Sequence, residues 1–414
     1  MNGIPQALPE DLEIQGNLLR HAWLASVGGS RRAQPVLVAS LMRERGPTGL
    51  QTHVRAFRAA MRESGQDAAL CTPWHAPWWQ SGAAWIGRRL VRMASSAVEV
   101  GWHRSTHQML LTRALKSTLA RHRGGCVVYA QCPVAALAAL SARKTCRQAV
   151  VMAVHFNISQ ADEWLGKGLI GAGSKQYNRI RKQEENVMPR LDGLVFVSEF
   201  MRNEVLERIP EAEQIPSVVL PNFVPDPGPC PQATPEADLI SIGSLEPRKN
   251  HLYLLDIVAA ARDMGTPLKL TLAGDGPQRA ALQARVRMLG LDSQVRFAGY
   301  VEDAARLLRR HRAYIHTADM ENMPLTLIEA LAYSRPVFAP PVGGIPEIFR
   351  DGQEGRFLPK SNPVEAATLV LDWLRQPARL AVANLAARER FLENFESSVV
   401  ATRLAGFLQS VAVH

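Results

Sequence analysis

The chain has 414 residues, 47% of them hydrophobic and 21% charged, which excludes a disordered chain and exceeds what one hydrophobic core usually supports. Its formal net charge of +10 favours an anionic partner: a nucleotide, a phosphate group, an acidic lipid or a nucleic acid. The five cysteines include no C-x-x-C pair, so we expect reduced, buried thiols and neither disulfides nor a zinc site. We expect a cytoplasmic protein, because no stretch resembles a secretory signal or a spanning helix.

Residues 1–34 precede the first clear strand and indicate no function. From residue 35, short β-branched runs alternate with segments in which apolar residues recur at helical spacing. Continuous apolar strands joined by helices predict a parallel sheet covered on both faces, so 35–222 is expected to be a Rossmann-like domain. Its expected strands are 36–40, 67–71, 126–130, 149–155, 193–198 and 218–222.

Two places in this domain are candidates for ligand contact. Thr48 and Gly49 lie in a glycine-containing loop between the first strand and a helix, which suits a phosphate-facing loop. His155 ends a strand and is expected at the ligand-binding edge, although a lone histidine there is more often structural. Ser198 and Glu199 fit the N-cap and first-turn acid of a helix instead.

Tryptophan and arginine are concentrated in one block of the first domain. Five of the eight tryptophans lie between residues 74 and 102, and a basic run follows at 113–123. Tryptophan near arginine suits a bilayer interface, where the ring lies at headgroup level and the cation meets anionic lipid. An ordinary amphipathic helix packed on the sheet explains the pattern equally well. If residues 86–100 are helical, one apolar stripe is expected: Ile86, Leu90, Met93, Ala97 and Val100.

A proline-dense stretch at 223–238 is typical of a linker. The alternation then restarts, which predicts a second Rossmann-like domain over 239–395. Its expected strands are 239–244, 268–274, 295–300, 313–318 and 336–340. Doubly wound sheets bind ligands at the carboxyl ends of their strands, so we expect the chemistry on the loops that follow these strands.

The strongest motif is HTADMENMPLTLIEALAYSRPV, residues 316–337. Glu321 is expected in a loop, and Glu329 about one and a half turns into a helix that Pro324 opens. A helix start presents free N–H groups to a diphosphate, and a carboxylate accepts paired sugar or ribose hydroxyls. Two glutamates can also share a solvated face by chance, but this strand–loop–helix setting favours a site.

The second motif is SIGSLEPRKN, residues 241–250. After a tight turn at Gly243, Arg248 and Lys249 stand just before a helix, where they can neutralise a diphosphate. Positive charge is slightly unfavourable at a helix start, which favours a functional pair over a solvated one. The glycines of LAGDGPQ and Gly299 permit positive φ or close backbone approach, and are equally well explained as structural turns.

These motifs, together with VRFAGYVED and VGGIPEI, resemble in order and spacing the donor domain of family 4 glycosyltransferases, over residues 239–359. FVSEFMRNEV, VVLPN and GPTGLQTHV extend the resemblance more weakly over 36–222. It implies the GT-B fold, an α/β architecture of two Rossmann-like domains facing across a cleft. It also implies a C-terminal helix over 396–414 that packs back on the first domain.

By position, the resemblance implies that Glu321 holds the donor sugar, Glu329 holds the ribose, and Arg248 and Lys249 bind the diphosphate. His155 completes the catalytic set. The chain departs from the family pattern at Ser244, Asn322 and Asn222-Phe223. Further residues implied to bind the substrate are Thr48, Gly49, Gly243, Gly299, Tyr300, Val301, Asn322, Met323, Pro324, Leu325 and Thr326.

The implied reaction is a metal-independent transfer of a hexose with retention of configuration, from a UDP- or GDP-sugar and without a cofactor. The implied acceptor is a glycolipid, a polyprenyl-diphosphate-linked oligosaccharide or a polysaccharide precursor, in bacterial-type surface polysaccharide assembly. The expected location is peripheral at the inner face of the cell membrane, with residues 74–123 on the anionic surface. Two alternatives remain open: a nucleotide-sugar epimerase of the same architecture, and a basic nucleic-acid-binding protein. The second is disfavoured because the aromatic residues form one block and do not follow a groove.

Overall fold

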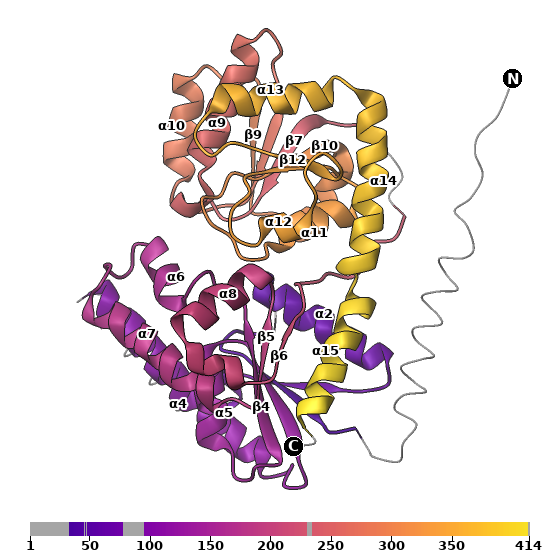
Figure 1. Ribbon diagram of the computed structural model, residues 1–414. Coiled ribbons are helices and arrows are strands. Elements are labelled where there is room, and N and C mark those ends of the chain that lie inside the picture. The colour runs from indigo at the N-terminus through magenta and orange to yellow at the C-terminus, as the bar shows by residue number, and fades with distance from the viewer. Residues whose placement is uncertain (1–32, 45, 47, 78–94, 230–233, 413–414) are drawn as a thin grey trace, which may run out of the picture. The chain divides into compact units, whose positions relative to one another are not determined.

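The computed structural model describes residues 33–44, 46, 48–77, 95–229 and 234–412 (Figure 1). Residues 1–32 and 78–94, and with them most of the predicted apolar stripe, lie outside the described residues. The described chain contains two six-stranded sheets, in which all neighbouring strands are parallel. The doubly wound α/β architecture predicted from the sequence is therefore confirmed.

The first sheet has the strand order β2-β1-β3-β4-β5-β6. Its strands are short and almost wholly apolar, so both faces of the sheet need a cover of helices. The strands are β1 (Val36–Ala39), β2 (Ala68–Cys71), β3 (Cys126–Ala130), β4 (Gln148–Val154), β5 (Gly193–Phe196) and β6 (Ser217–Val219).

Alternate residues of these strands pack into two separate hydrophobic cores, because successive side chains of a strand point to opposite faces. Leu37 packs with the helices α4 (Ser96–Leu119) and α5 (Pro133–Ala142). Val36 packs on the other face with α2 (Gly49–Glu63) and α15 (Ser397–Val411). Figure 1 shows these two helix layers on either side of the first sheet. The last helix of the chain thus belongs to the core of the first sheet.

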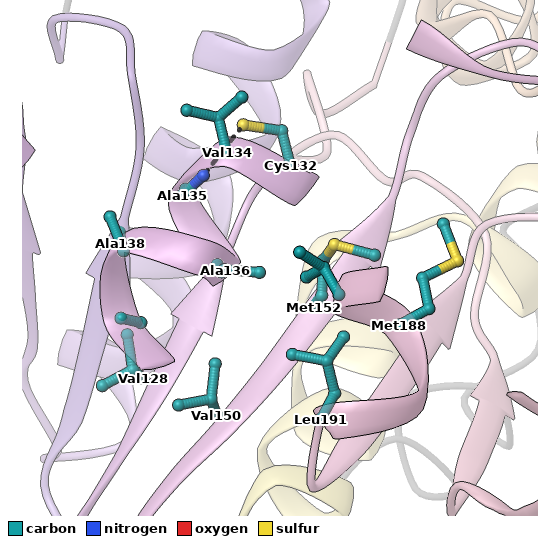
Figure 2. Close-up of a cluster of buried hydrophobic side chains, with 14 of the residues drawn as sticks. Val128, Cys132, Val134, Ala135, Ala136, Ala138, Val150, Met152, Met188 and Leu191 are labelled. Atoms are coloured by element: carbon teal, nitrogen blue, oxygen red, sulfur yellow. Dashed lines mark hydrogen bonds between the residues drawn. The ribbon is translucent and has the colours of Figure 1, made fainter. Parts of the chain in front are cut away.

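Figure 2 shows the core on the α5 face, where Val128, Val150 and Met152 of the strands meet the alanines of α5. Small side chains allow this helix to lie close to the sheet. Cys132 caps α5 by accepting a hydrogen bond from the N–H of Ala135. Cys71, Cys126 and Cys132 are free and buried as predicted, whereas the prediction was wrong for Cys146, which is free but exposed.

The second sheet has the order β12-β11-β10-β7-β8-β9. One face is covered by α9 (His251–Asp263), α10 (Arg279–Met288) and α13 (Pro363–Leu374). The other is covered mainly by α11 (Leu325–Ala332) and α14 (Pro377–Asn394). The strands are β7 (Ala237–Ile242), β8 (Leu270–Ala273), β9 (Val295–Gly299), β10 (His311–Ile315), β11 (Val337–Ala339) and β12 (Gly355–Phe357).

The chain changes direction across the second sheet between β7 and β10. From β7 it proceeds through β8 and β9 to one edge, and from β10 through β11 and β12 to the other. The loops that follow β7 and β10 therefore diverge at a topological switch point, where doubly wound sheets bind ligands. Both of the strongest sequence motifs lie on these two loops.

Every predicted strand is present, with ends shifted by up to three residues. The three-residue β12 was not predicted, because a strand that short has no periodicity. The predicted domain boundaries stay a prediction. The remaining described α-helices are α6 (Gln160–Gly166), α7 (Lys175–Val187), α8 (Glu199–Arg208) and α12 (Ile345–Ile348). None of the helices described is both long and apolar enough to cross a bilayer.

Candidate active site

The cation pair stands on a tight connection between β7 and α9. Gly243 follows β7 with φ 152°, and a short 3-10 turn over Pro247–Lys249 carries Arg248 and Lys249. Asn250 then takes the left-handed conformation, φ 50°, and its side chain caps α9. A Cβ at Gly274 would lie 1.8 Å from the carbonyl oxygen of Gly243, so the glycine of the neighbouring loop is required for close backbone packing.

Hydrogen bonds tie this loop to the loop after β10. The hydroxyl of Thr317 donates to the backbone oxygens of Lys249 and Asn250, each at 3.1 Å. The N–H of Asp319 donates to the backbone oxygen of Arg248, also at 3.1 Å. Asn250 in turn donates to the Asp319 carboxylate at 2.8 Å. The backbone that carries the cations is thus fixed against the segment that leads to Glu321.

Glu321 is the centre of an ion cluster. Its carboxylate contacts the ammonium of Lys249 and lies 3.1 Å from the guanidinium of Arg248 and 3.6 Å from the ring of His316. Only 8% of the Glu321 side chain is exposed. Burial alone would raise the pKa of Glu321, but Lys249 and His316 hold that pKa well below its ordinary range. Glu321 is therefore ionised throughout the physiological pH range.

The Gly343-Gly344 pair of the VGGIPEI motif packs directly against the backbone of the Glu321 loop. A Cβ at Gly343, where φ is 56°, would lie 1.9 Å from the backbone oxygen of Glu321. A Cβ at Gly344 would lie 2.1 Å from the backbone oxygen of Asn322. Only glycine leaves room for the loop at both positions, which gives this motif a structural reason.

Two asparagines connect the Glu321 loop to the first sheet. The Asn322 side chain donates to the backbone oxygens of Phe156, at 3.0 Å, and Val154, at 3.4 Å, which flank His155. It also accepts a hydrogen bond from the hydroxyl of Ser198. Asn222 donates to the backbone oxygen of Met323 at 2.8 Å. Two of the positions at which the chain departs from the family pattern thus join the two halves of the site.

His155 directly follows β4, one position beyond the strand that was predicted to end with it, and its ring is a neutral hydrogen-bonding group. The ring lies edge-on to His53, with 4.6 Å between centroids, and its Nε2 is 3.2 Å from the side-chain oxygen of Gln131. Burial lowers the pKa of His155 to about 4, and a hydrogen bond with Asn222 offsets this only in part. His155 can donate or accept a hydrogen bond here, but it carries no charge near neutral pH.

The helix α11 carries the second predicted carboxylate. Pro324 directly precedes this helix and does not form its first turn, a small correction to the prediction. Burial raises the pKa of Glu329 to about 7, with a further contribution from Asp303. Thr326 is held by a 2.8 Å hydrogen bond from the Tyr314 hydroxyl. Leu325 lies close to Gly49: a Cβ added to Gly49 would be 3.2 Å from a side-chain methyl of Leu325. The two predicted loops therefore meet here.

The described part of the chain matches two related protein families. Residues 231–391 match the family described as "Glycosyl transferases group 1", and residues 48–222 match "Glycosyl transferase 4-like domain". The chain belongs to the group 1 glycosyltransferase family. The segment 48–222 contains every strand of the first sheet except β1, and the segment 231–391 contains the whole second sheet, so the site above is built from both matched segments.

Similar curated proteins include one that matches most of this chain and nearly all of its own length. It is the GDP-mannose-dependent alpha-(1-6)-phosphatidylinositol monomannoside mannosyltransferase of Mycolicibacterium smegmatis, 24% identical over 381 residues, or 87% of this chain and 94% of that protein. Phosphatidyl-myo-inositol mannosyltransferase of Mycobacterium leprae is 28% identical over 170 residues, 40% of this chain. That match spans only 44% of the Mycobacterium leprae protein.

Solved structures of glycosyltransferases share the fold. HepE of Anabaena, solved in complex with UDP, has a TM-score of 0.64 and 17% identity over 92% of this chain and all of that one. TarM of S. aureus has a TM-score of 0.61 and 16% identity over 72% of this chain and 58% of that one. At these identities the likeness concerns the fold, and it agrees with the GT-B architecture expected from the motifs.

Some predicted residues have other roles in the structure. Thr48 forms a capping box with Gln51 at the start of α2, so its hydroxyl stabilises this helix. Gly299 has φ 70°, and Tyr300 after it is 62% exposed. Within the described residues, no hydrogen bond or ion pair links Tyr300 or Val301 to the Glu321 cluster. Their contact with a nucleoside stays a prediction.

Sequence reasoning missed two members of the site. His316 contacts Glu321, and its position at the end of a predicted strand and the start of the strongest motif could have indicated it. Glu163, on α6 of the first half, has a pKa raised by burial and affected by the charges of Lys167, Arg248 and Glu321. No pattern in the sequence places Glu163 near the second half. Among the described residues, no group of three or more His, Cys, Asp or Glu is arranged to hold a metal ion.

Proposed function

We propose that this glycosyltransferase moves a hexose from a nucleoside-diphosphate sugar to a lipid-linked acceptor, with retention of configuration and without a metal ion. The observation that carries the proposal is the cluster of Arg248, Lys249 and Glu321 at the switch point of the second sheet. Two cations there can neutralise the leaving diphosphate, which is the work a metal ion does in other transferases. The ionised Glu321 can accept hydrogen bonds from the sugar hydroxyls.

In the proposed reaction the bond between the sugar C1 and the diphosphate oxygen breaks as the acceptor oxygen bonds to C1 from the same face. The proton of the acceptor hydroxyl passes to the departing phosphate, so no protein base is required. Arg248 and Lys249 stabilise the charge that develops on the diphosphate. The neutral ring of His155 forms a hydrogen bond with the sugar, and Glu329 accepts hydrogen bonds from the ribose hydroxyls.

Two observations support a lipid-linked acceptor and a location at the inner face of the cell membrane. The relatives named above include enzymes whose names give phosphatidylinositol derivatives. On the first half of this chain, α4 exposes Trp102, which belongs to the Trp/Arg-rich block whose composition suits an anionic surface. A precursor of a bacterial-type surface polysaccharide is the class of acceptor that we propose.

The test supplies UDP- and GDP-hexoses with a polyprenyl-diphosphate-linked or phosphatidylinositol acceptor, and follows product by mass spectrometry and by NMR of the anomeric proton. We expect an α-linked product from an α-linked donor, and an unchanged rate with EDTA. A β-linked product would contradict retention. Conversion of the donor to an epimeric sugar without any acceptor would establish the epimerase alternative instead.

A further inference from the structure

A pocket of about 350 Å³ lies between α4 and α7, on the helix layer of the first sheet, and is built from residues outside the Glu321 cluster. Gly101 of α4 allows the two helices to approach, because a Cβ there would lie 3.2 Å from the Gln176 side chain on α7. The volume falls in the range of small-ligand sites and far exceeds the space that one water needs. The pocket can therefore hold a group of several heavy atoms.

The side chains that line the pocket include four cations and no carboxylate: Arg104, Arg179, Lys182 and Arg190. Arg104 is buried, 7% exposed, and donates to the amide oxygens of Gln160 and Gln183, each at 2.6 Å. Both partners are uncharged. Glu184, the carboxylate next to Gln183, is fully buried and paired with Arg208 at 2.9 Å. The pocket thus has excess positive charge with a guanidinium in its wall, which suits a phosphate group.

An exposed apolar stripe runs along α4 beside this pocket. Val98, Trp102 and Met109 are 55%, 38% and 43% exposed. Their spacing of four and seven residues places them on one helix face, opposite the buried face formed by residues such as Val100 and Leu111. Ser105 stands between Trp102 and Met109 on this face and also lines the pocket. Apolar side chains next to a cationic pocket match the two layers of a membrane surface.

We propose that the α4–α7 pocket binds the phosphorylated headgroup of an anionic membrane lipid, while Val98, Trp102 and Met109 enter the bilayer interface. A phosphodiester fits the charge of the pocket, and the amides of Gln108 and Gln176 can bind the hydroxyls of a headgroup. A free phosphate ester would leave the apolar stripe without a role. The inference specifies the membrane association proposed above and does not depend on the transfer reaction.

The test is co-sedimentation of the full chain with vesicles of phosphatidylcholine, alone or mixed with phosphatidylglycerol. The pocket variant removes three exposed cations: Arg179→Ala, Lys182→Ala and Arg190→Ala. A matched control removes two arginines and one lysine, all exposed, elsewhere: Arg55→Ala, Lys269→Ala and Arg287→Ala. We expect the pocket variant to bind the anionic vesicles on the order of 100-fold more weakly, and the control to change binding by less than about threefold. A thermal melt of both variants checks that each is folded.

Further arms separate the pocket from other sources of binding. Equal weakening by both triple variants would show that net charge alone acts, and would overturn the proposal. Equal binding of neutral and anionic vesicles would overturn it too. Trp102→Ser is expected to weaken vesicle binding several-fold and to leave the affinity for glycerol 3-phosphate unchanged. Tight binding of glycerol 3-phosphate without any vesicle binding would assign the pocket to a soluble phosphate ester instead. If the unmodified chain binds the vesicles but transfers no sugar, the proposed reaction is refuted and the proposed lipid site is not.

Discussion

The guanidinium of Arg248 lies 3.1 Å from the carboxylate of Glu321, although 73 positions separate the two residues in the chain. The sheet topology explains this proximity. β7 and β10 are neighbours, with Ala237 paired to His311, so the loops after these strands leave the same edge of the sheet. Opposite charges that the fold brings together at this edge are available to a ligand that carries both phosphates and hydroxyls.

The replacement Lys249→Ala is expected to lower kcat/KM by about 100- to 1,000-fold, because it removes a cation that stabilises the charge developing on the leaving diphosphate. Glu321→Gln keeps the size of the side chain and is expected to reduce turnover to a similar degree. Steady-state kinetics with the preferred donor measure both effects, and circular dichroism checks the fold.

Glu213→Gln is the matched control, because Glu213 is exposed and its replacement removes the same charge outside the Glu321 cluster. We expect the control to retain its rate within about twofold. Rates near those of the unmodified enzyme in both Lys249→Ala and Glu321→Gln would refute the site assignment.

Donor binding is expected to tighten as the pH rises through about 7, because the pKa of Glu329 is raised to about 7 and its carboxylate is the better acceptor for ribose hydroxyls. Calorimetric titration with UDP and with GDP at pH 6 and pH 8 measures the effect. Glu329→Gln should reduce this dependence on pH. A variant that keeps the full dependence would show that another group is responsible.

The raised pKa of Glu329 also makes the free energy of unfolding depend on pH. Its pKa is about 7 in the folded chain and 4.5 as the ordinary reference, so the folded state holds the proton more tightly. Stability from this group is greatest below about pH 4.5 and is lost as the pH rises toward 7, by no more than about 3 kcal/mol. Urea unfolding at pH 5.5 and pH 8 should show a smaller difference for Glu329→Gln than for the unmodified chain.

Asn322→Ala is expected to lower the free energy of unfolding by about 1–3 kcal/mol, because it leaves the buried backbone oxygen of Phe156 and the hydroxyl of Ser198 without their partner. The double variant with Ser198→Ala tests the coupling. If the two side chains interact as the structure shows, the combined loss is smaller than the sum of the two single losses. If the two single losses of stability add up to the loss in the double variant, the contact is contradicted. The control is Asn203→Ala, because Asn203 is exposed.

Both sheets could be predicted from the sequence, because parallel strands are short apolar runs and their crossover helices have their own period. The placement of Arg248, Lys249 and Glu321 on loops at one sheet edge followed from the rule that ligands bind at strand carboxyl ends, whereas the ion pairs between them were not predicted. The hydrogen bonds of Asn322 and Asn222 could not be predicted, since they join residues more than 100 positions apart on different sheets. Glu163 was missed for the same reason, as its place near Arg248 depends on how α6 is positioned.

The most direct test of the account is a crystal structure with whichever of UDP or GDP binds more tightly. We predict that the diphosphate contacts both Arg248 and Lys249, with the ribose against Glu329 and the space beside Glu321 left for the sugar. A diphosphate bound elsewhere, with Arg248 and Lys249 still paired to Glu321 alone, would contradict the account.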